Sequence, residues 1–127
     1  MKIIKTKINF KDDRGIIRDI MSHTFVDAMT YITFTENAIR GNHYHKKTMQ
    51  YDYIISGKLI CRTREDENKE IEEVVVEAGD LIIHQYPFWH AYKALEDSVM
   101  ISSTNGPRQG DQYEDDTFRL TDEQKLF

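Results

Sequence analysis

The stretch Arg40 to Gly57, RGNHYHKKTMQYDYIISG, decides how the rest of the sequence is interpreted. His43 and His45 are separated by one residue, so on an extended strand both imidazoles lie on the same face. Gln50 comes five residues after His45, which leaves room for a short turn before a strand over Tyr51 to Ile55. This stretch therefore predicts two neighbouring strands that carry the chemically active side chains of the protein.

A second stretch, Gly79 to His90 (GDLIIHQYPFWH), supplies another turn, a short apolar strand and a further histidine. The glycine of Ser56-Gly57 predicts a hairpin turn after the first stretch. If the two stretches fold against each other, His43, His45, Gln50 and His90 surround one cavity. His84 and His23 are interpreted as structural, because His84 lies in an apolar strand and His23 near a loop.

The rest of the chain consists of short β-rich segments separated by turns. Strands are expected over Ile3–Phe10, Ile16–Met21, Phe25–Phe34, Leu59–Arg64, Glu70–Val76, Leu81–His84 and Val99–Ser103. Turns every eight to twelve residues or so indicate a closed sandwich or barrel, whose interior can hold one ligand. Thr121 with Gln124 resembles a capping box and predicts a short C-terminal helix. A chain of 127 residues is most simply one domain, residues 1–127.

Composition excludes several classes of function. The net charge of -5 argues against general nucleic-acid binding, which needs a basic surface. No apolar run approaches the length of a membrane span, and the N-terminal stretch lacks the apolar core of a signal peptide, so a cytoplasmic protein is expected. Cys61 is the sole cysteine, which is compatible with a reducing compartment.

Two polar regions are expected to be loops. Asn105 to Asp116 contains glycines and many polar residues, and such a loop could cap a site or contact a partner. The acidic runs Glu65-Asp66-Glu67 and Glu114-Asp115-Asp116 are expected to be solvated.

The order His-x-His, then Gln50, then Gly57, followed by Gly79 and Pro87-x-x-His90, resembles the two cupin motifs. Arg40 to Lys46, RGNHYHK, together with Trp89-His90 and Asp13-Arg14-Gly15, more narrowly resembles the WxcM-like dTDP-sugar 3,4-ketoisomerases. The resemblance runs from about Asp13 to Ser103. It implies an all-β, RmlC-like cupin fold, a jelly-roll barrel also described as a double-stranded β-helix.

The resemblance also implies an activity and a set of roles. Members of that family move a keto group between C3 and C4 of a dTDP-linked hexose as homodimers, without a required metal. Carried over to this sequence, His43 and His45 become the acid and base, and Tyr31 lines the same cavity. Arg40 becomes a candidate for the substrate phosphates or for structural pairing. Candidate substrate contacts complete the set: Gln50 and Trp89, whose ring could stack on a sugar or a base.

Imidazole chemistry agrees with this activity. Ketone migration requires a proton to leave a carbinol carbon and another to arrive on the neighbouring carbon, through an enediol. An imidazole can both take and give a proton near neutrality, because its ordinary pKa is about 6.5. A second donor, His43 or Tyr31, could hydrogen-bond the developing enediolate oxygen. Epimerisation next to a ketone would use the same groups.

Two other functions stay open at this point. His43, His45, His90 and the amide oxygen of Gln50 could ligate Zn, Ni, Fe or Mn, as in a metal-dependent oxygenase, lyase or 3,5-epimerase-like enzyme. Gln50 is the weak point of this interpretation, since an amide is a poorer ligand than the Glu that is usual in metal-binding cupins. The other alternative is a cupin that binds a sugar or another metabolite without catalysis. His43 and His45 could also be only a hydrogen-bonded structural pair.

Overall fold

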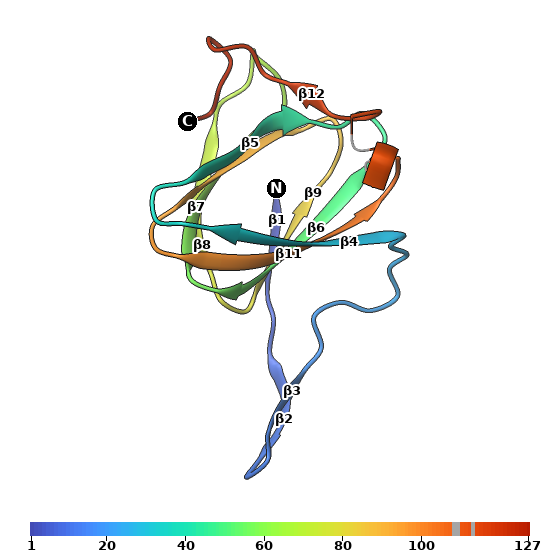
Figure 1. The fold of residues 1–127 in the computed structure, drawn as a ribbon, viewed down its shortest axis with the longest axis vertical. Helices are drawn as coiled ribbons and strands as arrows, with labels where there is room; N and C mark the ends of the chain where they lie inside the picture. The colour runs from blue at the N-terminus through green and yellow to red at the C-terminus, as the bar shows by residue number, and fades with distance from the viewer. Residues whose placement is uncertain (108–109, 113) are drawn as a thin grey trace.

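Two antiparallel five-stranded sheets face each other and form a barrel (Figure 1). The computed structural model describes residues 1–107, 110–112 and 114–127. One sheet has the order β1-β9-β6-β11-β4, the other β12-β5-β10-β7-β8, and β2 and β3 pair separately. The strands are β1 (Lys2–Lys5), β2 (Ile8–Asp12), β3 (Gly15–Arg18), β4 (Ala28–Phe34), β5 (Ile39–Tyr44), β6 (Met49–Ser56), β7 (Lys58–Arg64), β8 (Glu72–Glu77), β9 (Asp80–His84), β10 (Trp89–Ala94), β11 (Ser98–Asn105) and β12 (Phe118–Arg119).

The interior of the barrel is apolar towards one end and polar towards the other. On β6 the inward positions run from Gln50 through Asp52 to Ile54, and all three side chains are buried. On β10 they run from His90 through Tyr92 to Ala94. The apolar part packs residues of both sheets against one another: Phe34, Ile54, Leu59, Cys61, Val76, Ile82, Tyr92, Ala94 and Met100. The inward positions of these strands thus pack the apolar core at one end of the barrel and place polar side chains at the other end.

A bulge in β5 sets the register of the histidine strand. His43 pairs with His90, but Gly41 already pairs with Ala91, so Asn42 is an extra residue on β5. Gly41 has φ +97°, and a Cβ there would lie 2.8 Å from the carbonyl oxygen of His90. Glycine is therefore required at this close approach of two backbones. Because Asn42 is extra, the register shifts by one residue between the Gly41–Ala91 and His43–His90 pairs, and His43 lies beside His90 inside the barrel.

The expected short C-terminal helix is wrong; the segment forms a single turn. Half of the predicted capping box is present, since the Thr121 N–H donates to Gln124 Oε1 over 3.0 Å. The turn does not continue, because the Leu126 N–H donates to Asn42 Oδ1 over 2.8 Å. The residues that the structure describes contain no α-helix, only the 3₁₀ turn η1 (Gly110–Gln112). None of them forms a helix that could cross a membrane.

The N-terminal region differs from its prediction as well. Instead of one strand over Ile3–Phe10, β1 pairs with β9 and ends at Lys5, where Thr6 bonds through both its N–H and its hydroxyl to the Gly79 carbonyl. The chain then leaves the barrel, and β2 and β3 form a hairpin that projects away from it (Figure 1). Neither β10 nor β12 was predicted as a strand.

Asp116 corrects the expectation that the run Glu114 to Asp116 is solvated. Its side chain is 2% exposed and accepts hydrogen bonds from the Lys46, Lys47 and Thr48 N–H groups and from the Thr48 hydroxyl. The end of the expected loop thereby fixes the connection between β5 and β6. Within that loop, Arg108, Gln109 and Tyr113 lie outside the described residues.

Asp116→Ala should lower the free energy of unfolding by about 2–3 kcal/mol, because the buried amide and hydroxyl of Thr48 lose their acceptor. Urea unfolding at pH 7 measures the change. Asp115→Ala is the matched control, since Asp115 is exposed, and it should stay within about 0.5 kcal/mol of the wild type. Equal losses in both variants would contradict this account of Asp116.

The same carboxylate makes part of the stability depend on pH. Burial raises the pKa of Asp116, but the hydrogen bonds from Lys46, Thr48 and Lys47 outweigh it and hold the pKa below its ordinary value of 3.8. A depressed pKa contributes stability above the unfolded value and loses it as the pH falls through the folded value. The difference between the wild type and Asp116→Ala should therefore shrink below about pH 4.

Candidate active site

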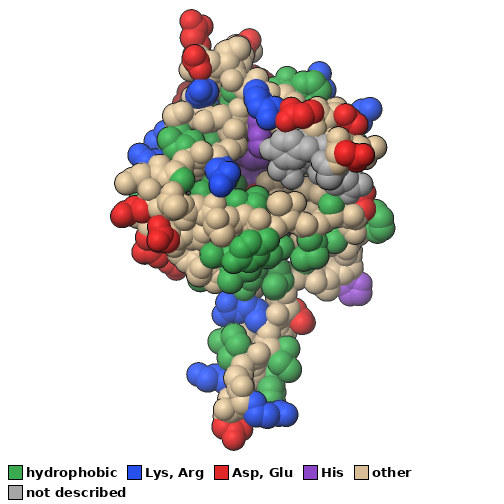
Figure 2. Space-filling view, in the orientation of Figure 1, with side chains coloured by type: hydrophobic (Ala, Val, Ile, Leu, Met, Phe, Trp, Pro, Cys, Tyr) green, Lys and Arg blue, Asp and Glu red, His purple; other side chains and the backbone are tan. Residues whose placement is uncertain are grey.

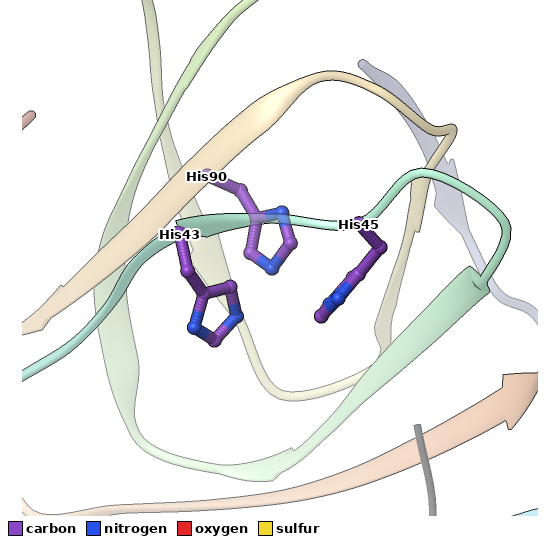
Figure 3. A group of neighbouring side chains, drawn as sticks. All are labelled: His43, His45 and His90. Atoms are coloured by element: carbon purple, nitrogen blue, oxygen red, sulfur yellow. The ribbon is translucent and has the colours of Figure 1, made fainter. Parts of the chain in front are cut away.

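Three histidine rings meet inside the polar part of the barrel. The ring centroids of His43 and His45 are 5.0 Å apart, those of His43 and His90 are 4.7 Å apart, and those of His45 and His90 are 5.3 Å apart. One nitrogen from each ring lies within 4.8 Å of the others. Figure 3 shows the three side chains pointing toward one another from β5, from the residue just after β5, and from β10.

His45 is held from two sides. Its Nδ1 lies 2.6 Å from the carbonyl oxygen of Asp116, and its Nε2 lies 3.1 Å from Oε1 of Gln50. A backbone carbonyl can only accept, so Nδ1 of His45 carries a hydrogen. Both contacts are satisfied together when the ring carries hydrogens on both nitrogens, which is the form that can give a proton to a substrate.

A buried carboxylate behind Gln50 was not singled out from the sequence. Asp52 is fully buried, and Gln50 Nε2 donates to both of its oxygens, over 3.0 and 2.9 Å. The Tyr92 hydroxyl donates to Asp52 Oδ2 over 2.8 Å and lies 2.6 Å from His84 Nε2. The signal was present in MQYDYIIS, where Gln50 and Asp52 occupy alternate positions of a strand and so share its inward face.

The carboxyl of Asp52 stays ionised in this environment. Burial raises its pKa, but the hydrogen bonding and charge of the His84 imidazole, with help from Gln50, outweigh the burial and hold the pKa below its ordinary value. Burial and the charge of Asp52 raise the pKa of Tyr92 well above its ordinary value. Tyr92 therefore remains a phenol that donates to Asp52. His84, interpreted as structural from the sequence, belongs to the hydrogen-bond network that it forms with Tyr92, Asp52 and Gln50.

The His90 ring stacks on His84, with centroids 4.4 Å apart, but unlike the His45 ring it makes no hydrogen bond with the described residues. Its side chain is 2% exposed, and neither ring nitrogen has a hydrogen-bond partner among the described residues. Burial, together with the neighbouring His84, His43 and His45, lowers its pKa well below the ordinary value. His90 is thus a neutral imidazole whose nitrogens are available to a bound group.

The donor set also fits a divalent first-row metal ion. Three imidazole nitrogens within 4.8 Å of one another and the Gln50 oxygen beside His45 are ligands of the type such ions take. The unpartnered ring nitrogens of His90 agree with this fit. The same four groups could equally bind the oxygens of a substrate.

A cavity of about 550 Å³ opens beside the histidines. Its lining includes His43, His90, Gln50, Arg40 and Arg119. In Figure 2, histidine side chains are visible inside an opening flanked by basic side chains. A cavity of this volume is within the usual range for small-molecule sites.

The two arginines at this cavity already have contacts within the protein. Arg40 Nε donates to the Thr33 carbonyl over 3.2 Å, and its guanidinium lies 5.6 Å from the centre of the Phe34 ring. Arg119, which was not singled out from the sequence, forms a two-pronged ion pair with Glu114 over 2.7 and 2.8 Å. It reaches the site because β12 pairs with β5, with Arg119 opposite His43.

Tyr31 and Trp89 do not join the histidine cluster. Tyr31 lies among the residues around the cavity, but its side chain is 65% exposed and it alternates with Ile32 on the edge strand β4. Trp89 is 7% exposed and packs with Ala91, Leu120 and Leu126 on the outer side of β10. It is therefore absent from the cavity lining, and it supports the strand that carries His90.

Comparison with solved structures identifies the fold of the barrel. A dTDP-4-dehydrorhamnose 3,5-epimerase from Sulfolobus tokodaii superposes with a TM-score of 0.81 at 15% identity, covering 98% of this chain and 79% of that one. QdtA, a sugar 3,4-ketoisomerase from Thermoanaerobacterium thermosaccharolyticum in complex with TDP, gives 0.78 at 19% identity, covering 97% and 90%. The barrel therefore has the RmlC-like cupin fold, as the sequence motifs predicted.

A third structure, the capsular polysaccharide assembling protein CapF from Staphylococcus aureus, gives a TM-score of 0.63 at 26% identity. The match covers 91% of this chain but only 32% of CapF, so the chain spans about a third of that protein. A search of curated protein sequences found no match. The sequence does match the family described as "Polysaccharide biosynthesis C-terminal domain", over residues 10–118. Because this match covers most of the chain, the protein belongs to the polysaccharide biosynthesis C-terminal domain family.

Proposed function

We propose that the protein is an isomerase of a nucleotide-linked 4-keto-6-deoxy sugar, which moves the keto group between C4 and C3 in polysaccharide or unusual-sugar biosynthesis. The observation that carries the proposal is the cluster of His43, His45 and His90 beside a cavity of about 550 Å³. QdtA, a relative in fold, is a sugar 3,4-ketoisomerase solved with TDP and, as a mutant, with TDP-4-keto-6-deoxyglucose. The family match to polysaccharide biosynthesis agrees with such a substrate.

The reaction needs one base and one acid close to two adjacent carbons. One imidazole takes the proton from C3, the electron pair forms the C3–C4 double bond, and the C4 oxygen gains a proton to give the enediol. The O3–H proton then leaves as C3 becomes the ketone, and C4 receives a proton from an imidazole. The atoms balance without an external oxidant. His43 and His45 are close enough to share these steps across one sugar ring.

The substrate's diphosphate is proposed to lie towards the arginines. Arg40 and Arg119 are the guanidinium groups among the described cavity residues, and guanidinium suits phosphate oxygens. Tyr31, exposed at the cavity's edge, remains a candidate to contact the sugar or the nucleotide from outside. Gln50 remains a candidate substrate contact through its oxygen.

His45→Asn should lower the turnover of TDP-4-keto-6-deoxyglucose by about 10²–10⁴-fold, because the substitution removes an acid-base group. Product formation followed by NMR measures the effect. His23→Asn is the control and should keep wild-type turnover, since His23 is exposed and lies outside the cluster. If the folded His45→Asn variant turns over the substrate at the wild-type rate, the role proposed for His45 is refuted.

A second candidate function is a metal-dependent cupin enzyme. The proximity of the three histidine nitrogens and the unpartnered His90 ring favour it. In that case His43, His45, His90 and Gln50 would hold the ion, which would supply Lewis acidity towards a substrate oxygen. The residues of the chain would still orient the substrate and move the protons.

Metal removal separates the two candidates. We expect dialysis against a chelator to leave isomerase turnover unchanged, because imidazoles alone can carry the proton transfers. Elemental analysis should accompany the assay, with a His43→Ala/His45→Ala variant as reference. Stoichiometric metal that survives dialysis and disappears in the double variant, with loss of activity on its forced removal, would favour the metal enzyme instead.

A homodimer is proposed on the basis of one apolar sheet surface. Across the outer face of the β1-β9-β6-β11-β4 sheet, the strand pairings put Ile4, Leu81, Tyr53, Ile101 and Tyr31 in one row. Tyr31 is 65% exposed and Ile4 is 38% exposed. Leu81 within the row is already buried, at 3% exposed, so the free apolar surface lies at Ile4 and towards Tyr31. Exposed apolar surface of this kind is typical of a contact site. This agrees with the homodimer that the family resemblance implies.

The hairpin β2–β3 adds further apolar surface next to this sheet. Ile8, Phe10, Ile16 and Ile17 are between 46% and 60% exposed. Figure 2 shows hydrophobic side chains along the projecting hairpin and on the barrel surface beside it. A second copy of the chain is the simplest partner that could cover both surfaces.

Light scattering after size exclusion should give twice the mass of the chain. Ile101→Glu should give the monomer mass, because it introduces a charge in the middle of the apolar row. Val75→Glu is the control, since Val75 is also exposed but lies on β8 of the opposite sheet. A wild-type monomer, or a dimer that Ile101→Glu leaves intact, would contradict the proposed interface.

We propose that residues 1–127 act as one cupin domain and that the protein works in the cytoplasm. The buried free thiol of Cys61 is compatible with a reducing compartment. Burial raises the pKa of this thiol, so it stays protonated and unreactive.

A further inference from the structure

The direction of the hydrogen bonds behind the histidine cluster is set by Asp52. An ionised carboxylate can only accept hydrogen bonds, so every group around it must donate. Gln50 therefore turns its NH₂ group towards Asp52, at 2.9 and 3.0 Å from the two carboxylate oxygens. The other end of the same amide, Oε1, then has to face His45 Nε2, 3.1 Å away.

The second arm of the network fixes Asp52 in place. The Tyr92 hydroxyl donates its one hydrogen to Asp52, and it therefore accepts a hydrogen bond from His84 Nε2. The side chains of Asp52, His84 and Tyr92 are all at most 3% exposed, so water does not compete for these bonds. The carboxylate thus accepts from Gln50 and Tyr92, and His84 Nε2 lies 3.4 Å from its Oδ2.

We propose that Asp52 is a positioning residue that makes Gln50 present its oxygen, and not its NH₂ group, to His45 and the cavity. This proposal rests on the proposed isomerase function for its consequence but on the hydrogen bonds alone for its geometry. Without Asp52 the amide of Gln50 has no preferred orientation, and its NH₂ group can cap the His45 Nε2 lone pair. His45 would then lose the position from which it exchanges protons with a substrate.

The same arrangement makes Gln50 resemble a carboxylate. Donation of the amide hydrogens to a buried negative charge polarises the amide and strengthens Oε1 as an acceptor. The Gln50–Asp52 pair therefore places one negative charge behind an oxygen that faces His45. Gln50 thereby offers His45 a stronger acceptor than an isolated amide would.

Exchange of the two side-chain types tests the proposal. Asp52→Asn should lower the turnover of TDP-4-keto-6-deoxyglucose by about 10–100-fold with a smaller change in KM, as is usual when the partner of an active-site group is lost. The double variant Gln50→Glu/Asp52→Asn should recover most of that loss. In this variant the amide introduced at position 52 donates to one oxygen of the carboxylate introduced at position 50, and the other carboxylate oxygen faces His45. The carbonyl of the introduced amide accepts from Tyr92.

Ile54→Ala is the matched control for destabilisation. Ile54 follows Asp52 on the inward face of β6 and is fully buried, but it belongs to the apolar cluster and not to the network. It should lower the unfolding temperature and keep wild-type turnover below that temperature. A folded Asp52→Asn with wild-type turnover, or a double variant no better than Asp52→Asn, would overturn the proposal.

A direct view of the amide keeps the proposal testable if the substrate is a different one. In the nitrogen-proton NMR spectrum of the wild type, the side-chain amide of Gln50 should be shifted downfield and exchange slowly with water, because it is bonded to a buried carboxylate. Its disappearance in Gln50→Glu assigns the signal. The signal should return to the ordinary amide range in Asp52→Asn. An ordinary, rapidly exchanging Gln50 amide in the wild type would refute the positioning role whatever the substrate is.

Discussion

An ionised carboxylate buried in a protein must be surrounded by donors, and the interior of this barrel is arranged around one such group, Asp52. Gln50 and Tyr92 donate to it from two opposite sheets, since β6 and β10 belong to different sheets. The cost of burying the charge is offset only if all of these bonds form together. The polar end of the barrel therefore has one favourable arrangement, and that arrangement also orients Gln50 towards His45.

The histidine strand is held from outside the barrel as well. The bulge residue Asn42 accepts from the Leu120 and Leu126 N–H groups, and the Asp116 carbonyl contacts His45. The segment after β11 thus returns to β5 and fixes both the strand and the loop that follows it. A site placed on rigid strands and supported on two sides is the arrangement that acid-base chemistry requires, because small displacements weaken proton transfer.

Much of this architecture was predictable from short-range patterns. Short strands separated by turns indicated a closed sandwich or barrel, and the spacing of His43 and His45 put both imidazoles on one face of a strand, because strand alternation and turns are local properties. The bulge at Asn42 and the burial of Asp116 depend on contacts between distant parts of the chain, so local sequence patterns could not reveal them. Trp89 illustrates the opposite error, since it was a candidate substrate contact but alternation puts it on the other face of β10. Thr121 and Gln124 formed the predicted local bond, but the Leu126 N–H donates to Asn42 Oδ1 and no helix follows.

The most direct test of the central claim is the fate of the keto carbon itself. The purified protein should be incubated with carbon-13-labelled TDP-4-keto-6-deoxyglucose, and the sugar carbons should be followed by NMR in D₂O. We expect the carbonyl signal to move from C4 to C3 and C4 to become a carbinol carbon. Recovery of unchanged substrate, or a product changed only in the configuration of carbons next to a ketone still at C4, would contradict it.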